Sequence, residues 1–164
     1  MSDAVRYEFS DLRALPYRDA WFPLVVSLST LEHVGMDNSG YGGSSRASID
    51  PVAETIGAMR ELRRVTITGG AALVSVPFGL RSDRGWLRVF DAEDLDGLTR
   101  HSGWRVQHAC FYRAMIDGWR ECTMQAAAMA GYNDPRRCSA PALRTAPTWV
   151  AAAEAVALLE LTAL

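Results

Sequence analysis

Two nearly continuous apolar runs stand out along the 164 residues of the chain. Residues 22–28 read FPLVVSL and residues 71–76 read AALVSV, the second run being bounded by Gly69, Gly70 and Pro77. Short apolar runs without charges are typical of strands that are buried on both faces of a parallel sheet. We therefore expect two central strands at these positions.

Two longer segments carry apolar residues at helical spacing, and each follows an aspartate. Asp50 stands before Pro51, and Asp91 stands before residues 92–101, which are followed by Gly103. Aspartate is a favoured N-cap residue, proline fits the first helical position, and glycine commonly ends a helix. The pattern predicts one helix starting at Pro51 and a second over residues 92–101.

Shorter signals complete the prediction of secondary structure. Residues 7–9 and residues 104–112 are predicted as strands, with residues 119–126 as an antiparallel partner of the latter. Strands that alternate with helices favour an α/β domain with a mostly parallel sheet. The short connection between the last two strands indicates an antiparallel edge.

The most apolar stretch is residues 149–164, interrupted by Glu154 and Glu160. A helix of that length would measure roughly 24 Å, which is short of a bilayer core of about 30 Å. We predict a helix that packs on the domain or on a partner, not a membrane span. The chain then divides into an α/β domain, residues 1–132, and a linker with the C-terminal helix, residues 133–164.

Composition and charge add few restrictions. Hydrophobic residues make up 49% of the chain and the net charge is −2, so no basic field is available to attract nucleic acid. The three cysteines, Cys110, Cys122 and Cys138, show no CxxC spacing and indicate reduced thiols in a cytoplasmic protein. Charged Asp3 and Arg6 are incompatible with a secretory signal.

Three sequence motifs occur in order between about residues 7 and 113. Residues 11–19 read DLRALPYRD, residues 22–34 read FPLVVSLSTLEHV, and residues 59–77 read MRELRRVTITGGAALVSVP. They resemble the patterns D-x-x-x-L-P-F-x-D, F-D-x-V-x-S-x-x-x-L-E-H-V and L-R-E-x-x-R-V-L-K-P-G-G-x-L-x-x-x-x-P of class I S-adenosylmethionine-dependent methyltransferases. The resemblance implies the C-terminal part of a Rossmann-like methyltransferase sheet.

The chain also departs from the family pattern. The family's N-terminal glycine-rich loop and the acidic residue that binds the ribose have no counterpart, and Pro23 replaces the aspartate of the second motif. The resemblance implies that the strands pairing with residues 22–28 are missing, which leaves an apolar edge of a kind that proteins normally avoid. Three arrangements would complete the sheet: pairing with another polypeptide, pairing with a second copy of the chain, or residues 7–9 pairing directly with residues 22–28. A misplaced start codon is a further explanation for the missing strands.

The resemblance assigns cofactor contacts to two turns. Asp11 would accept a hydrogen bond from the adenine amine while the Leu12 N–H donates to ring nitrogen N1. Ser27, Leu28 and Ser29, at the carboxyl end of a strand, would face the methionine moiety. The alternatives are an aspartate that stabilises its own turn and serines that satisfy the backbone of the following segment.

Glu32 and His33 follow the same strand and are the candidate catalytic residues. A base is required only when the methyl acceptor carries a proton, and His33 could remove it; the alternative is a hydrogen-bonded histidine that anchors its loop. Ser29 stands where a metal-binding E-x-x-E-H pattern has its first glutamate, so no metal is expected. Tyr41 and Trp86 could form a lid over the acceptor, or could be ordinary packing residues.

The resemblance thus predicts a truncated S-adenosylmethionine-dependent methyltransferase that acts on a small molecule. The alternative is a non-catalytic partner or structural subunit that has lost its cofactor. In either case we expect a homo-oligomer or a partner chain that completes the sheet.

Overall fold

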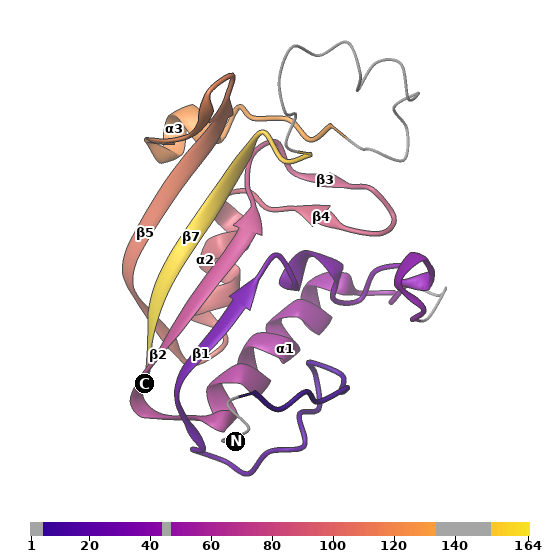
Figure 1. Cartoon of the computed structure of the whole chain (residues 1–164), viewed down its shortest axis with the longest axis vertical. Coiled ribbons are helices and arrows are strands. Elements are labelled where there is room, and N and C mark those ends of the chain that lie inside the picture. The colour runs from indigo at the N-terminus through magenta and orange to yellow at the C-terminus, as the bar shows by residue number, and fades with distance from the viewer. Residues whose placement is uncertain (1–4, 44–46, 134–151) are drawn as a thin grey trace.

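Five strands form one sheet in the order β1-β2-β7-β5-β6 in the computed structural model, which describes residues 5–43, 47–133 and 152–164 (Figure 1). The strands are β1 Phe22–Leu28, β2 Thr66–Pro77, β5 Trp104–Met115, β6 Gly118–Cys122 and β7 Ala155–Ala163. Strands β3 Ser82–Asp83 and β4 Arg88–Val89 form a separate ribbon. The helices are α1 Pro51–Val65, α2 Ala92–Arg100 and α3 Met124–Ala127, with 3-10 turns η1 Leu31–His33 and η2 Ser39–Tyr41.

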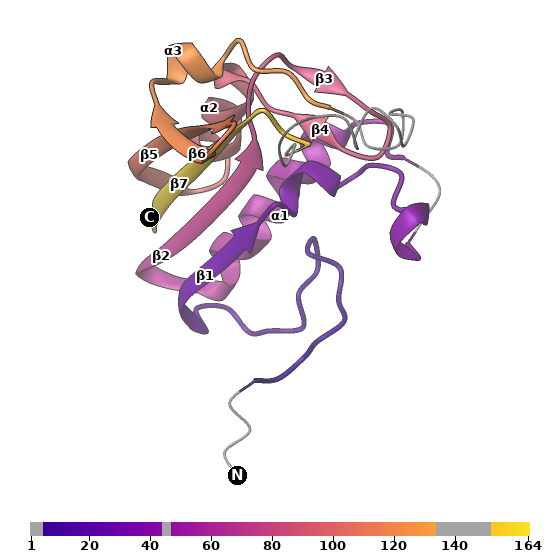
Figure 2. The ribbon, with the colours of Figure 1, turned by 45° about the horizontal axis from the view of Figure 1, so that its top comes forward.

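Both predicted helices are confirmed, and their caps explain where they begin. The Asp50 side chain accepts a hydrogen bond from the Ala53 N–H at 3.0 Å, directly before α1. Asp91 and Asp94 form a capping box at the start of α2. The two helices pack on the same face of the sheet, and the core lies between them and the strands (Figures 1 and 2).

The α/β fold is as predicted, but the sheet is mostly antiparallel. Only β1 and β2 pair in parallel, because β7 lies between β2 and β5 and runs antiparallel to both. Strand β2 also begins at Thr66, earlier than the expected residue 71. It accommodates a register shift at Gly70, where an added Cβ would lie 2.9 Å from the Pro23 carbonyl oxygen.

The predicted C-terminal helix is wrong, because β7 is a strand inside the sheet. Its buried side chains alternate strictly with more exposed ones, as period-two burial requires, and they are Ala155, Ala157, Leu159, Leu161 and Ala163. Pairing with strands on both sides outweighs the helical preference of alanine and leucine. In the described part of the chain, no helix has the length and hydropathy to cross a bilayer. The predicted linker and Cys138 lie outside the described residues.

The predicted strand at residues 7–9 is also wrong. Tyr7 and Phe9 are 83% and 98% exposed, and this extended segment pairs with no described strand. A strand is stable only when its main chain finds a partner, and β1 does not supply one here. The segment runs away from the sheet in Figure 2, so it does not pair with the outer edge of β1.

Residues 11–19, which follow this segment, are held against α1 by hydrogen bonds. Arg64 donates hydrogen bonds to the main-chain oxygen of Tyr17 and to Asp19, both at 2.7 Å, and the Leu15 N–H donates to Glu61 at 2.8 Å. Arg64 therefore holds the first motif, residues 11–19, against α1.

Candidate active site at the carboxyl end of β1

The chain turns sharply where β1 ends. Ser29 has a φ of +46°, and its N–H donates to the Ser75 carbonyl oxygen at 3.1 Å and to the Ser75 hydroxyl oxygen at 3.0 Å. These bonds hold the turn against β2 and direct the chain into η1, which carries Glu32 and His33. Ser75 was not singled out in the sequence, since nothing in its motif distinguishes it.

Glu32 is a buried carboxyl group. Its residue is 5% exposed, and its Oε2 atom has no hydrogen-bond partner among the described residues. Burial disfavours the charged form and raises the pKa of Glu32 to about 7. A carboxyl group with such a pKa exchanges a proton near neutral pH, which is the property that a general acid or base requires.

His33 contacts both aromatic residues that the sequence nominated as a lid. Its ring lies 5.3 Å from the ring of Tyr41 and 5.4 Å from that of Trp86. Its Nδ1 atom lies 2.8 Å from the Trp86 carbonyl oxygen. Because a carbonyl oxygen only accepts, Nδ1 carries the proton, and Nε2 is the basic nitrogen of the neutral ring.

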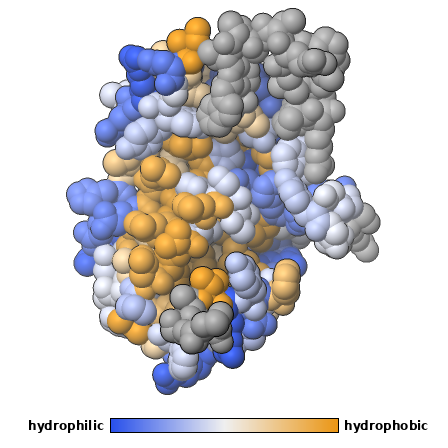
Figure 3. All heavy atoms as spheres, in the orientation of Figure 1, coloured by the Kyte–Doolittle hydropathy of each residue, from blue (hydrophilic) through white to orange (hydrophobic). Residues whose placement is uncertain are grey.

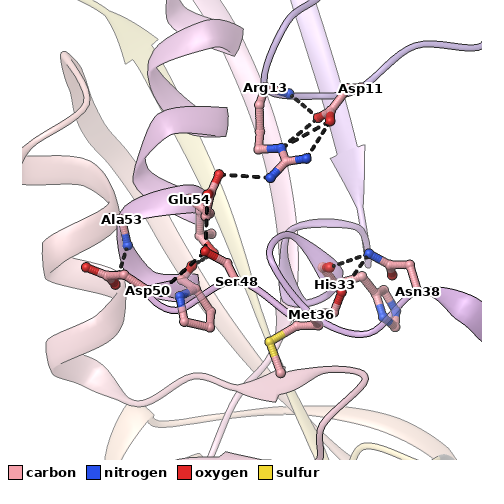
Figure 4. Close-up of polar contacts among 11 residues, drawn as sticks. Asp11, Arg13, His33, Met36, Asn38, Ser48, Asp50, Ala53 and Glu54 are labelled. Carbon is pink, nitrogen blue, oxygen red and sulfur yellow. Dashed lines mark hydrogen bonds and ion pairs between the residues drawn. The ribbon is translucent and has the colours of Figure 1, made fainter. Parts of the chain in front are cut away.

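A residue missed in the sequence holds this loop. The Asn38 side-chain amide donates to the carbonyl oxygens of His33 and Met36 at 3.1 and 3.2 Å (Figure 4). An asparagine in a glycine-rich loop often bonds the nearby main chain in this way, so its residue type was the available signal. Tyr41 remains 64% exposed whereas Trp86 is 8% exposed, so the cluster has one outer and one inner ring.

Asp11 is engaged by Arg13, which the sequence did not nominate. The Asp11 carboxylate accepts from the Arg13 N–H at 2.9 Å and from the Arg13 guanidinium at 2.6 Å (Figure 4). These hydrogen bonds lower the pKa of Asp11 to about 2. Arg13 also donates to Glu54, in the first turn of α1, at 2.9 Å. The arrangement fits the turn-stabilising alternative for Asp11.

A hollow of about 340 Å³ lies beside this ion pair. It opens between the turn that carries Arg13 and the start of α1, and its lining includes Arg13, Gly35, Met36, Asn38, Ser48 and Glu54. The lining offers both hydrogen-bond donors and acceptors, so it suits a polar group more than a hydrocarbon.

The described residues fit S-adenosylmethionine only in part. The Asp11 carboxylate could accept a hydrogen bond from adenine, and the Leu12 N–H could donate one. The bonds to Arg13 do not prevent this, because carboxylate oxygens can accept more than one hydrogen bond. The Ser29 N–H, by contrast, is already bonded to Ser75. The Ser27 hydroxyl is buried without a hydrogen-bond partner in the described ranges, and Leu28 is 63% exposed. No glycine-rich cradle for the rest of the ligand occurs in the sequence.

Within residues 5–43, 47–133 and 152–164, no cluster of three or more histidine, cysteine, aspartate or glutamate residues could hold a metal ion.

Comparison with known proteins gives structural matches alone. No protein-family model matches the chain, and no curated protein matches its sequence. The cyclase SpnF shares 20% identity over 99% of this chain, with a TM-score of 0.54. An S-adenosylmethionine-dependent methyltransferase from Methanosarcina mazei shares 11% identity over 94% of the chain, also with a TM-score of 0.54. A complex from Haloferax volcanii, between a methyltransferase activator and a proposed methyltransferase, matches with 12% identity over 99% of the chain and a TM-score of 0.54.

These similarities show that the chain has the class I methyltransferase fold. The chain spans 57% of the SpnF chain, 65% of the Methanosarcina chain and 63% of the Haloferax chain. SpnF is a cyclase, so the fold by itself does not fix the reaction.

Proposed function

We propose that this chain is part of an S-adenosylmethionine-dependent methyltransferase domain that acts on a small molecule. The observation that carries the proposal is the buried Glu32 and the oriented His33 beyond β1, in a chain with the methyltransferase fold. Open α/β sheets bind their ligands at the carboxyl ends of parallel strands, where these two residues lie. The bound cofactor would supply a methyl group on a positively charged sulfur.

Each candidate residue has a distinct role in this proposal. Asp11 and the Leu12 main chain hold the adenine edge, and the turn at residues 27–29 lies against the remainder of the cofactor. His33 Nε2 takes the proton of an acceptor O–H or N–H, with Glu32 as the alternative base. Tyr41 and Trp86, whose rings contact His33 and each other, close over the acceptor.

A second candidate function is a non-catalytic subunit that no longer binds the cofactor. The Asp11–Arg13 ion pair favours it, because Arg13 already occupies the carboxylate that adenine would use. The Haloferax protein is solved with an activator chain, which supports a partner for proteins of this fold. A homo-oligomer is the simplest version of such an assembly.

The test compares two ligands in calorimetric titrations of the full chain. Since the proposed contacts are to adenine, and the turn at residues 27–29 is the one proposed contact to the remainder of the cofactor, adenosine and S-adenosylhomocysteine are expected to bind with affinities within about threefold of each other, which is less than 1 kcal/mol. The Asp11→Asn variant is expected to weaken both. Asp96→Asn is the matched control, because Asp96 pairs with Arg100 on the exposed surface of α2.

Two outcomes would contradict the proposal. Absence of heat with both ligands at millimolar concentration would favour the non-catalytic subunit. Binding that is unchanged in Asp11→Asn would remove Asp11 from the site.

A further inference from the structure

Two hollows meet in a groove between α1, α2 and the β3–β4 ribbon. Figure 3 shows apolar side chains across the face of the sheet that is turned away from α1 and α2, whereas the groove lies on the side of the helices. The hollows measure about 410 and 380 Å³, and both are lined by Val52, Arg81, Arg88 and Asp94. Hollows of this size are within the range of pockets that bind small molecules.

Arg88 is a buried cation at the junction of the two hollows. Its side chain is 10% exposed, and a guanidinium carries five N–H donors. Among the described residues, the guanidinium forms one hydrogen bond, from Nη2 to the Asp94 carboxylate at 3.5 Å. Its carbon also lies 4.9 Å from the centre of the Phe90 ring, a contact that uses no N–H donor. A buried charge with so few acceptors is costly, so an anion in the groove would stabilise it.

The neighbouring acidic residues are engaged by other donors. Asp94 accepts two hydrogen bonds from Arg81, at 3.0 and 3.1 Å, and one from the Asp91 N–H at 3.3 Å. Asp83 lies opposite Arg88 in the register of the ribbon, but its carboxylate accepts from the Gly85 N–H at 2.6 Å. These bonds leave most of the Arg88 donors available for a ligand.

A second polar group lines the same groove. The hydroxyl oxygen of Ser82 lines one of the two hollows, and it is buried without a hydrogen-bond partner in the described part of the chain. Buried polar groups in proteins nearly always have a partner. Ser82 and Arg88 therefore give the groove two groups that a bound acceptor would satisfy.

The surroundings of Arg88 favour one class of anion. The planar guanidinium matches the two oxygens of a carboxylate or of a phosphate. Asp83, Glu93 and Asp94 also line the hollows, and their negative charge opposes a doubly charged phosphate more strongly than a singly charged carboxylate. The apolar part of the lining, which a hydrocarbon would contact, includes Val52, Ile56 and Leu98.

We propose that the groove binds a small monocarboxylate, whose oxygens accept hydrogen bonds from Arg88 and whose hydrocarbon part lies against Val52 and Ile56. The groove is a second ligand site, because neither lining includes a residue that we assign to the cofactor or to the methyl acceptor. The inference therefore goes beyond the proposed function and does not depend on it.

The test is a titration of the full chain with hexanoate, followed by NMR of the Arg88 Nε–H group and of the main-chain amides. We expect saturable shifts at Arg88 with a Kd on the order of 1 mM, as suits a ligand of eight non-hydrogen atoms. Hexanamide keeps the tail without the charge, and acetate keeps the charge without the tail. Each is expected to bind at least roughly tenfold more weakly, as is inorganic phosphate.

A pair of variants on α1 assigns the contact. Val52→Asp places a negative charge in both hollows, and an acidic residue is favourable in the first turn of a helix, so the variant is expected to fold. It should weaken hexanoate binding at least about tenfold. Ala53→Asp is the matched control, because Ala53 is an exposed neighbour that lines neither hollow, and it should bind like the parent.

A third variant tests the geometry of the guanidinium. Arg88→Lys keeps the charge but loses the two parallel N–H groups, so it is expected to weaken hexanoate binding about tenfold. Circular dichroism checks that each variant is folded. If Arg88→Lys does not fold, the comparison of Val52→Asp with Ala53→Asp still decides, because both positions are exposed.

Four results would overturn the proposal. The first is the absence of a saturable shift at Arg88 in tens of millimolar hexanoate, and the second is equal binding of hexanoate and hexanamide. The third is tighter binding of phosphate, which would assign the groove to another class of anion. The fourth is equal weakening in Val52→Asp and Ala53→Asp. The adenosine titration tests the proposed function separately, since it measures a ligand at Asp11.

Discussion

The Nδ1 atom of His33 lies 2.8 Å from the carbonyl oxygen of Trp86 and joins two loops that are 53 residues apart in sequence. A second bond, from the Asp37 N–H to the Gly85 carbonyl oxygen at 2.9 Å, runs parallel to it. The loop after β1 and the β3–β4 ribbon are therefore one mechanical unit. The position of the candidate base depends on that unit as much as on the strand that precedes it.

His33→Phe tests this connection. Phenylalanine keeps the contacts with Tyr41 and Trp86 but cannot donate to the Trp86 oxygen, so the free energy of unfolding is expected to fall by about 1–2 kcal/mol. Amides of residues 34–43 are expected to exchange faster than in the parent chain. In His101→Phe, at an exposed position after α2, the unfolding free energy should stay within about 0.5 kcal/mol; an equal loss in both variants would contradict a specific role for the bond.

Glu32 is expected to make stability depend on pH. Its pKa rises from 4.5 to about 7 on folding, so the folded state binds the proton more tightly than the unfolded state. The stabilisation by the protonated form is complete below pH 4.5 and is lost as the pH rises through 7. The loss is on the order of 3 kcal/mol by the usual conversion of pKa differences.

Urea unfolding between pH 4.5 and 8 measures this effect. Glu32→Gln keeps the shape without the charge, so it should unfold with a flatter pH profile and be more stable than the parent at pH 8. The matched control is Glu93→Gln, whose side chain is 85% exposed. Parallel profiles for the parent and Glu32→Gln would show that Glu32 is ionised at neutral pH.

Arg13 is expected to control the titration of Asp11. Arg13→Gln removes the guanidinium that lowers the pKa of Asp11 to about 2, so this pKa should rise toward 3.8. Carboxyl carbon shifts in a pH titration by NMR give the value. Stability should change by less than about 1 kcal/mol, because the pair is half-exposed. A pKa that stays near 2 in this variant would assign the effect to another group.

Two leucines on opposite faces of β7 test the corrected C-terminus. Leu161 is fully buried, so Leu161→Ala is expected to cost about 2–5 kcal/mol of unfolding free energy. Leu158, on the other face of β7, is 38% exposed, and Leu158→Ala should cost about 1 kcal/mol or less. Equal losses at the two positions would argue against a strand with one buried face.

The sequence predicted correctly the helix starts and the strand that depend on residues close together in the chain. Asp50 and Asp91 cap their helices as their residue types indicate, and the apolar run at residues 22–28 is a strand. The segments at residues 7–9 and in β7 were mistaken because strand formation depends on a partner far away in sequence. The first lacks that partner, and the second has one on each side.

The sequence predicted where the candidate residues lie relative to β1, but not most of the contacts that they make. The motif placed Glu32 and His33 at the end of β1, and the structure brings His33 together with Tyr41 and Trp86. The burial of Glu32 and the ion pair between Asp11 and Arg13 depend on how loops fold over β1 and α1. No spacing in the sequence encodes those contacts.

We propose that this chain keeps the adenine end of a nucleotide site. Backbone-amide NMR of the full chain during a titration with adenosine tests it most directly, with the distant Ile116 amide as an internal reference. We predict that the Leu12 amide shifts with saturable dependence on adenosine while Ile116 stays unchanged. A Leu12 amide that does not move at millimolar adenosine, while other amides do, would contradict the claim.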